Sequence, residues 1–544
     1  MRAADFIVSS LKAHGVKRVY LVPGESYLAL LDALYHSGIE IVVCRHEGGA
    51  GFMAIAEAKL TGRPAVLLVS RGPGATNASI AVHSAEQEGV PLIVMIGQVS
   101  REERTRAVFQ EVDYGQFFGG MAKAVYEVNE AAKLNELVPR SFRLACEGVA
   151  GPVVFSLPED MLRDEVGEPE VVTFPLPVIG GAEHELARIQ EMIAHSERPL
   201  IMAGAKLRGA AGADALARFA AAQRIPVAVT WKNQDVFDNG SDLFAGHLTP
   251  STTLGQRKVL AQADLIIAVG TRLGDFATLG FTLPEAPVPK QTLIHIYPDN
   301  APIGKVIRAD LGIVADPVAV LNGLSSSVRV GSALRERWVS EVNAATKAAQ
   351  KFTSPEPDDG VDFGVVTMAL AKLAPADAII TTDAGNMSTW HHRHWLMKTS
   401  QILLGCIAGA MGFGVPAAVA AQLVYSQRMA ICLVGDGGVL MTGNELATAM
   451  AYGLKPKIVI SNNNIYGTIR SHQEKNYPTR VSGTNLLNPD FTAWAKSFGA
   501  ETFELALGDD VEAVVGAFLA SRGAAVLHVK SSAKALSAGG MLKD

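Results

Sequence analysis

Two apolar segments near the C-terminal end of the chain each lead into polar residues, and this pairing strongly constrains the fold. Ile431–Val434 is followed by Gly435-Asp436-Gly437, and Lys457–Ser461 is followed by Asn462-Asn463. Residues 443–453 between them have the apolar spacing of a helix. A strand, a helix and a strand in this order predict a right-handed crossover, which brings the ends of two neighbouring parallel strands to one edge of a sheet.

The polar residues at these strand ends can form a metal site. Asp436 and Asn463 are 27 positions apart and would meet at the same edge. Carboxylate and amide oxygens suit Mg²⁺, which proteins usually share with phosphate groups. The spacing therefore predicts a magnesium-diphosphate site. A Gly-Asp-Gly sequence alone is also typical of a tight turn, so this interpretation depends on the second strand end.

The rest of the chain also alternates between apolar strands and helical segments, which predicts an α/β fold with parallel sheets. Its 544 residues suffice for about three domains. Segments rich in Pro and Gly at 165–181 and 354–360 are typical of linkers. We therefore expect three consecutive doubly wound parallel-sheet domains, at residues 1–165, 184–330 and 361–535.

Composition disfavours several classes of protein. The net charge is −6 and no basic run is present, which argues against nucleic acid as a partner. No uncharged apolar stretch reaches the ~18 residues of a membrane span, and the N-terminus lacks the features of a signal peptide. The four cysteines are scattered, as in a reducing cytosol. We expect a cytoplasmic protein that acts on small molecules.

A second candidate carboxylate, Glu47, follows the apolar segment Ile41–Cys44 and opens a helical segment. A glutamate at a helix start is often only a favourable partner of the helix dipole. In an apolar pocket its proton affinity would rise, and it could act in proton transfer. Residues 45–50, Arg-His-Glu-Gly-Gly-Ala, resemble the Arg-His-Glu-Gln-Gly-Ala of the acetolactate-synthase-like branch of thiamin-diphosphate-dependent enzymes, with Gly48 in place of glutamine.

The resemblance extends over nearly the whole chain. The Gly-Asp-Gly and Asn-Asn residues match the two ends of the family's cofactor motif, and residues 22–24, 70–77 and 412–418 are similar to further family motifs. The resemblance implies a pyrimidine-binding first domain, a central domain of the nucleotide- or FAD-binding type and a diphosphate-binding third domain. In the central domain, Arg272, Asp299 and the loop 204–209 are candidates for contacts to a nucleotide.

The resemblance also implies thiamin diphosphate and Mg²⁺ as cofactors and leaves FAD open. Glu47 would activate the cofactor, Met411 would support its bent shape, and Asp436, Asn463 and the Ile465 carbonyl would bind the metal. The further cofactor-binding residues implied are Pro23, Gly24, Pro73, Asn77, Gly385, Asn386, Met387, Gly409, Gly435, Gly437, Gly438, Tyr466, Gly467 and Thr468.

Phe109-Gln110 marks the branch of the family, because simple 2-oxo acid decarboxylases usually carry paired histidines in the corresponding loop. The resemblance thus implies decarboxylation of a 2-oxo acid such as pyruvate, with transfer of the acyl anion to a second carbonyl compound. It further implies a homodimer or homotetramer with active sites at the subunit interface.

The pocket departs from the family pattern at several positions. Arg71 replaces a small residue, Glu159 replaces a lysine, and Thr468 and His472 replace the methionine and tryptophan of biosynthetic acetolactate synthases. His472 is either a catalytic proton donor or a surface residue. The departures leave open a lyase or a non-ligating decarboxylase that acts on a larger or diketone substrate. The intact Glu47, with the metal-site residues, disfavours a nucleotide-binding or regulatory protein on the same fold.

Overall fold

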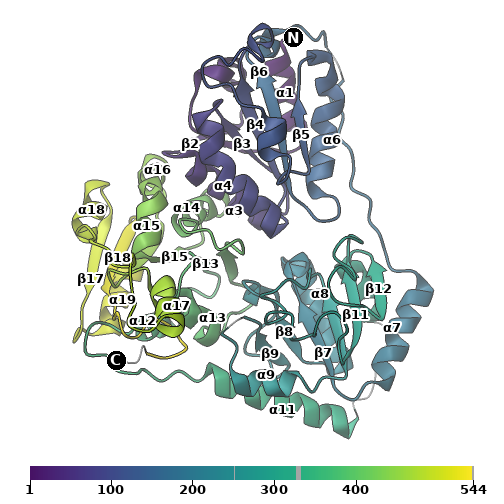
Figure 1. The fold of residues 1–544 in the computed structure, drawn as a ribbon, viewed down its shortest axis with the longest axis vertical. Helices are drawn as coiled ribbons and strands as arrows, with labels where there is room; N and C mark the ends of the chain where they lie inside the picture. The colour runs from purple at the N-terminus through teal and green to yellow at the C-terminus, as the bar shows by residue number, and fades with distance from the viewer. Residues whose placement is uncertain (169, 250, 326–331, 542–544) are drawn as a thin grey trace.

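The computed structural model describes residues 1–168, 170–249, 251–325 and 332–541. It contains three six-stranded sheets whose paired strands run parallel, with helices packed around them (Figure 1). This confirms the predicted α/β fold class. The predicted end of the central domain, at residue 330, lies outside the described residues.

The first sheet, at the top of Figure 1, has the order β2-β1-β3-β4-β6-β5. Its strands are β1 (Arg18–Leu21), β2 (Glu40–Val43), β3 (Ala65–Val69), β4 (Leu92–Gln98), β5 (Ala124–Glu127) and β6 (Pro152–Pro158). Its helices are α1 (Ala3–Ala13), α2 (Leu28–Leu34), α3 (Glu47–Thr61), α4 (Pro73–Glu88), α5 (Tyr114–Phe118) and α6 (Leu134–Cys146). The strands β3, β4 and β6 are buried throughout, as expected where helices cover both faces of a parallel sheet.

The central sheet has the order β12-β11-β10-β7-β8-β9. Its strands are β7 (Pro199–Ala203), β8 (Val227–Val229), β9 (Phe244–His247), β10 (Leu265–Val269), β11 (Thr292–Tyr297) and β12 (Leu311–Val314). Its helices are α7 (Glu183–His195), α8 (Ala210–Gln223), α9 (Leu254–Leu260) and α10 (Pro317–Leu324), and α11 (Ala333–Gln350) leads on to the third sheet (Figure 1).

The third sheet has the order β14-β13-β15-β16-β18-β17. Its strands are β13 (Ile379–Thr382), β14 (Ile402–Gly405), β15 (Ala430–Gly435), β16 (Lys457–Asn462), β17 (Glu501–Leu505) and β18 (Ala525–Lys530). Its helices are α12 (Phe363–Leu373), α13 (Ser388–His394), α14 (Gly414–Val424), α15 (Asp436–Thr442), α16 (Leu446–Ala451), α17 (Gly467–Asn476), α18 (Phe491–Ser497) and α19 (Val511–Ala520).

The predicted crossover unit of the third sheet is present, but its helix differs from the prediction. Strands β15 and β16 pair in parallel, with Gly435 opposite Ser461. The helix was expected at 443–453, whereas α15 begins at Asp436 itself and a 3₁₀ turn separates it from α16. The glycines after Asp436 have low helix propensity and concealed this start. The carboxylate at the first turn favours it, because it lies at the positive end of the helix dipole.

The first and third sheets belong to one continuous apolar core. Helix α3 packs against α14, and the rings of Phe52 and Phe413 lie edge to face with centroids 5.6 Å apart. The buried Glu445 carboxylate accepts hydrogen bonds from the amides of Arg45 and His46, each at 3.0 Å. A side chain at Gly49 would lie 2.4 Å from that carboxylate, so the close approach requires glycine. The start of α3 is thereby fixed to the third sheet.

None of the helices in the described part of the chain has the length and apolar character that crossing a lipid bilayer requires.

Candidate functional site

Glu47 lies at the first turn of α3, at the edge of the first sheet where the strands end. The cap of this helix is His46, whose Nδ1 accepts a hydrogen bond from the Gly48 amide at 3.0 Å. Glu47 is therefore free of the capping role. Its Oε2 accepts a hydrogen bond from Asn77 Nδ2 at 2.9 Å, and a side chain at Gly74 would lie 3.3 Å from its Oε1. The two predicted residues Glu47 and Asn77 thus lie together.

The turn after β1 packs closely on the turn after β3. A side chain at Gly24 would lie 2.5 Å from Ser70 Cβ, which explains the glycine that follows Pro23. Pro73 is the first residue of α4, a position where its missing N–H has no helical partner to lose. Gly74 lies close to both Ser70 and the Glu47 carboxylate, so the two turns meet beside that carboxylate.

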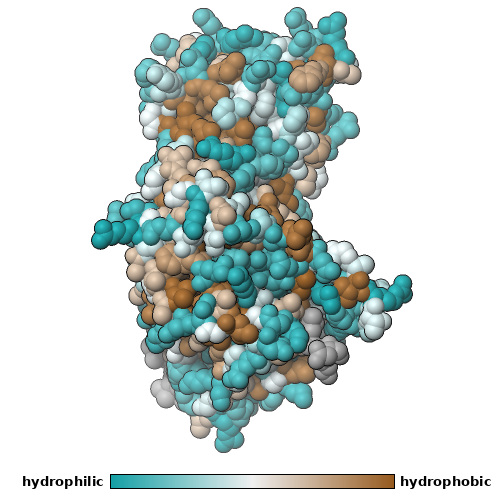
Figure 2. All heavy atoms as spheres, turned by 90° about the vertical axis from the view of Figure 1, so that its left-hand side faces the viewer, coloured by the Kyte–Doolittle hydropathy of each residue, from teal (hydrophilic) through white to brown (hydrophobic). Residues whose placement is uncertain are grey.

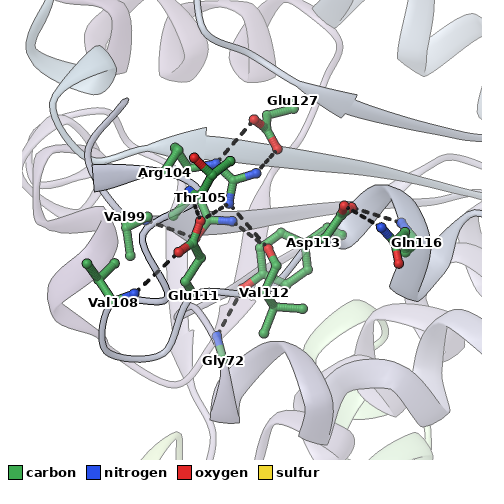
Figure 3. Close-up of polar contacts among 12 residues, drawn as sticks. Gly72, Val99, Arg104, Thr105, Val108, Glu111, Val112, Asp113, Gln116 and Glu127 are labelled. Atoms are coloured by element: carbon green, nitrogen blue, oxygen red, sulfur yellow. Dashed lines mark hydrogen bonds and ion pairs between the residues drawn. The ribbon is translucent and has the colours of Figure 1, made fainter. Parts of the chain in front are cut away.

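Gln110 and Phe109 lie in the loop that follows β4. Figure 3 shows this loop through its neighbours Val108 and Glu111. Gln110 has a left-handed backbone, with φ of 65°. A side chain at Gly72 would lie 2.9 Å from Gln110 Cβ, so the loop packs directly on the turn after β3. Phe109 is 78% exposed in the single chain. An aromatic ring this exposed is available to a second molecule or a ligand.

Glu111 holds this loop together. Its carboxylate accepts hydrogen bonds from the Thr105 amide at 2.6 Å and from Arg104 Nη1 at 3.2 Å (Figure 3). The bond from the Thr105 amide is the main cause of a lowered pKa of Glu111. Arg104 also donates to Glu127 Oε2 at 2.5 Å, on strand β5. The loop needs this support because Thr105 and Ala107, like Gln110, have positive φ.

Asp383 follows β13 and was missed by the sequence analysis. Its fully buried carboxylate accepts a hydrogen bond from the Gly412 amide at 2.9 Å and one from the Gly414 amide at 3.3 Å. Burial raises the pKa of Asp383 to about 6. The carboxylate fixes the segment that carries Met411. The one signal for it in the sequence was its place directly after an apolar strand.

Met411 and Tyr466 pack on the glycine turn after β15. A side chain at Gly437 would lie 2.5 Å from Tyr466 Cε1 and 3.2 Å from Met411 Cε. A side chain at Gly438 would lie 3.0 Å from Asp383 Oδ2. Gly437 and Gly438 are therefore required for close packing, and the predicted residues Met411, Gly437, Gly438 and Tyr466 are brought together.

The turn after β13 lies against the glycine turn that follows β15. Gly385 has φ of 137°, and a side chain there would lie 2.8 Å from Met387 Sδ, while one at Gly435 would lie 3.7 Å from that sulfur. Asn386 Oδ1 accepts a hydrogen bond from Thr468 Oγ1 at 3.0 Å. Gly409 has φ of 70° and forms the turn before Met411. These contacts join three predicted segments of the third sheet into one site.

Asp436 lies at the centre of the predicted metal site. Its carboxylate is buried, which raises its pKa, and its Oδ2 accepts hydrogen bonds at 2.8 Å from the Asn464 amide and from Asn488 Nδ2. The amide of Ile465 donates to Asn463 Oδ1 at 3.3 Å. Asn488 was not predicted, because it lies in an irregular segment far along the chain.

Ile465, whose carbonyl is a predicted metal ligand, forms an isolated antiparallel β-bridge with Asn485. This bridge is held by the Asn464 carbonyl and the Tyr466 amide, which bond to Leu486 and Thr484. The Ile465 carbonyl is not used in these two bonds. This turn therefore carries three kinds of oxygen, which are the carboxylate of Asp436, the side-chain amide of Asn463 and the main-chain carbonyl of Ile465.

Helix α17 begins at Gly467, beside this turn. Its capping residue, Tyr466, makes no side-chain bond to the first helical amides. Those amides are donors of the kind that bind phosphate. A side chain at Gly467 would lie 3.3 Å from Leu536 of the C-terminal tail, so the tail packs beside the helix start. His472, further along α17, is exposed, as a surface residue would be.

A cavity of about 1270 Å³ lies between the central sheet and the other two. Lys206 and Arg272 line it, and the stacked rings of Trp231 and Phe276 form part of its wall, with centroids 4.1 Å apart. Asp299 instead accepts a hydrogen bond from the Val149 amide at 2.9 Å. Of the predicted nucleotide contacts, Arg272 and the loop 204–209 therefore face the cavity.

The hydrogen bonds of the two key carboxylates, Glu47 and Asp436, fall into two sets within one chain. Glu47 accepts a hydrogen bond from the first sheet's helix α4, whereas Asp436 accepts its hydrogen bonds from turns of the third sheet. Among the described ranges, no hydrogen bond or ion pair joins the Glu47 carboxylate to the Asp436 turn.

Comparison with known proteins identifies the relatives of this chain. Three models of thiamine pyrophosphate enzymes match it: the N-terminal TPP binding domain at residues 1–117, the central domain at 186–324 and the C-terminal TPP binding domain at 383–529. The acetolactate synthase large subunit of Parasynechococcus marenigrum is 32% identical, over 92% of this chain and 82% of its own. The isozyme 2 large subunit of Escherichia coli is 32% identical, over 97% and 95%.

Each match falls within a different one of the three sheets, and the residues predicted to bind the metal lie after β15 and β16. The protein is thus a member of the thiamine pyrophosphate enzyme family.

Proposed function

We propose that the protein decarboxylates a 2-oxo acid such as pyruvate and transfers the acyl group to a second carbonyl compound, as an acetolactate synthase does. The observation that carries this proposal is the ordered loop that presents Phe109 and Gln110 beside the turn next to Glu47. The names of the two relatives described above agree with it. One bond between a carboxyl and an oxo carbon breaks, CO₂ leaves, and a new carbon–carbon bond forms with uptake of one proton.

The residues of the third sheet suit the cofactor's diphosphate and a magnesium ion. The uncapped start of α17 offers amide donors, and Asp436, Asn463 and the Ile465 carbonyl offer oxygen ligands. A cation would also offset the desolvation that raises the pKa of Asp436. Thiamin diphosphate, when bound, would supply the electron sink for loss of CO₂.

The residues around this cofactor have separate roles in the proposal. Glu47 exchanges a proton with the bound cofactor from the edge of the first sheet. Met411, held by the Asp383–Gly412 hydrogen bonds, supports the shape of the cofactor. Gln110 orients the second carbonyl compound through its amide without readily giving up a proton.

We further propose that the working enzyme is at least a homodimer. The two groups of residues, around Glu47 and around Asp436, would complete each other across a subunit interface. The exposed Phe109 supports this arrangement. So does the apolar surface in the upper part of Figure 2, where the first sheet and its helices lie. Homodimer and homotetramer are both compatible with it.

The interdomain cavity can hold a nucleotide such as FAD. Its volume of about 1270 Å³ exceeds that of most small-molecule sites. Lys206 and Arg272 offer cations for phosphate groups. A flavin absorption spectrum in the purified protein would support this part of the proposal. The absence of bound flavin after addition of FAD would contradict it.

Product analysis tests the main proposal. Purified protein is incubated with pyruvate, thiamin diphosphate and Mg²⁺, and the products are separated. Acetolactate is the expected product. Acetaldehyde alone would support a non-ligating decarboxylase instead. No consumption of pyruvate by protein with bound cofactor would favour a lyase with a larger or diketone substrate. The polar residues Arg71 and Thr468 are departures from the family pattern that favour this alternative.

A further inference from the structure

Glu445 lies in the 3₁₀ turn between α15 and α16, and its side chain reaches the start of α3 beside the first sheet. Its Oε1 accepts hydrogen bonds from the amides of Arg45 and His46, each at 3.0 Å. Its Oε2 accepts one from Thr448 Oγ1 at 2.6 Å. The side chain is completely buried. Glu445 therefore joins the third sheet to the first through hydrogen bonds that are shielded from water.

The two amides that donate to Glu445 lie between a strand and a helix. Strand β2 ends at Val43, whereas α3 begins at Glu47. The amides of Arg45 and His46 in this connection need an acceptor from outside both elements. A hydrogen bond to a carboxylate contributes about 1.5–3 kcal/mol, and a negative charge is also favourable at the start of a helix. Glu445 thus fixes the two residues that directly precede Glu47.

The start of α3 is weak by itself. Glu47 is followed by Gly48 and Gly49, and glycine is a poor helix former because its backbone keeps the most freedom. A side chain at Gly49 would lie 2.4 Å from Glu445 Oε1. The glycine that weakens the helix therefore also admits the carboxylate that supports it. This close fit indicates that the turn before Glu47 is built around Glu445.

We propose that Glu445 is a positioning residue for Glu47, which it orients toward the bound cofactor by fixing the two residues before it. This inference rests on the proposed role of Glu47 in proton transfer. A proton moves only over hydrogen-bond distances, and a shift of about 1 Å in a reacting group lowers a rate about 100-fold. Glu445 acts through the backbone and is not itself the proton carrier, because its oxygens already accept bonds from Thr448 and the two amides.

A second carboxylate holds α3 further along the same helix. Glu57 Oε2 accepts hydrogen bonds from Tyr20 Oη at 2.6 Å and from Arg18 Nη1 at 3.2 Å. Its side chain is only 12% exposed. Loss of Glu57 should loosen the later part of α3 without moving its start. Glu57 is therefore the matched control for Glu445, since both are enclosed carboxylates that fix one helix.

The test measures the step that is assigned to Glu47. Hydrogen–deuterium exchange at C2 of the thiazolium ring is followed by NMR after acid quench, on protein loaded with thiamin diphosphate and Mg²⁺. Exchange should slow about 100-fold in Glu445→Ala, with little change in cofactor affinity by calorimetry. Glu445→Gln keeps the length and an oxygen for both amides, so its rate should stay within about fivefold of the wild type. Glu57→Ala should exchange as fast as the wild type.

The protein without cofactor supplies a second measurement. Exchange of the backbone amides in residues 44–50 is followed by mass spectrometry. It should be faster in Glu445→Ala than in the wild type, because the amides of Arg45 and His46 lose their acceptor. It should be unchanged in Glu57→Ala. If Glu445→Ala does not fold, Glu445→Asp decides, since it keeps the charge but withdraws the carboxylate by one methylene, and its C2 exchange should slow about 10-fold.

Several results would overturn the inference alone. They are C2 exchange at the wild-type rate in the folded Ala or Asp variant, equal slowing in Glu57→Ala, and a Glu445→Gln protein as slow as Glu445→Ala. The last result would make the charge of Glu445 responsible and not its hydrogen bonds. A wild-type protein that binds thiamin diphosphate but exchanges C2 no faster than the free cofactor would overturn the proposed role of Glu47, and this inference with it.

Discussion

At the scale of single residues, the candidate site depends on a few carboxylates in distinct surroundings. Glu47 contacts Asn77 beside a turn, whereas Asp383 is enclosed by backbone amides and Asp436 faces amides of two turns. Burial raises the pKa of both aspartates. The different surroundings agree with the roles proposed above, which are proton transfer for Glu47, packing for Asp383 and metal binding for Asp436.

Replacement of Glu47 tests the first of these roles. We predict that Glu47→Gln abolishes turnover, because the amide cannot exchange the proton that activates the cofactor. Thiamin diphosphate should still bind, since the proposed diphosphate contacts lie in the third sheet. Steady-state rates and calorimetry measure the two effects. Glu40→Gln, on the neighbouring strand, serves as the control, and a Glu47→Gln enzyme with normal turnover would sink the assignment.

Glu111 should act as a positioning residue for Gln110. In Glu111→Gln the loop loses its charged acceptor for the Thr105 amide and Arg104, and three residues with positive φ are left less constrained. We predict a loss of about 10- to 100-fold in product formation, with little change in cofactor affinity. Glu127→Gln, which removes the other partner of Arg104, should have the smaller effect. Equal activity of Glu111→Gln and wild type would contradict this role.

At the scale of elements, a buried histidine of helix α13 and one of strand β9 link stability to pH. His391 is fully buried with neither ring nitrogen hydrogen-bonded among the described residues, and burial lowers its pKa to about 3. Burial likewise lowers the pKa of the neighbouring His247 to about 3. Both rings are neutral in the fold at neutral pH. Below about pH 6.5 the unfolded chain binds protons first, so acid favours unfolding.

We predict that each of these histidines removes about 2 kcal/mol from the free energy of unfolding when the pH falls from 7 to 5. Denaturant titrations at the two pH values measure the difference. His391→Phe keeps an aromatic ring of similar shape and should lessen the loss. His195→Gln, on the exposed face of α7, should not. A loss in His391→Phe as large as in the wild type would argue against this source of acid sensitivity.

The elements differ in how well the sequence predicts them. The strands Ala430–Gly435 and Lys457–Asn462 are buried almost throughout and were predicted within about two residues, because a parallel strand is covered on both faces. The edge strands Ala124–Glu127 and Glu501–Leu505 were missed, since their partial exposure tolerates polar residues. Asn488 and Asp383 were missed because only the folded chain brings them to the site.

At the scale of the whole molecule, the separation of the two residue groups has a direct test. Glu47→Gln and Asp436→Ala each inactivate a different half of the proposed site. If each site combines one half from each subunit, mixed dimers contain one intact site. We predict that refolding the two inactive variants together restores activity, up to roughly a quarter of the wild-type level by random pairing. Mixtures that stay inactive, although the subunits exchange, would place both halves in one chain.

The apolar core shared by the first and third sheets affects how the chain folds during synthesis. Helix α3 is buried along most of its length, partly by α14, which begins 353 positions after α3 ends. At about 5–20 residues per second, the ribosome needs roughly 20–70 seconds to make that intervening chain. For this interval the nascent α3 lacks its final partner and exposes Phe52 and its neighbours. The chain should therefore depend on a chaperone that binds apolar helices until its last third emerges.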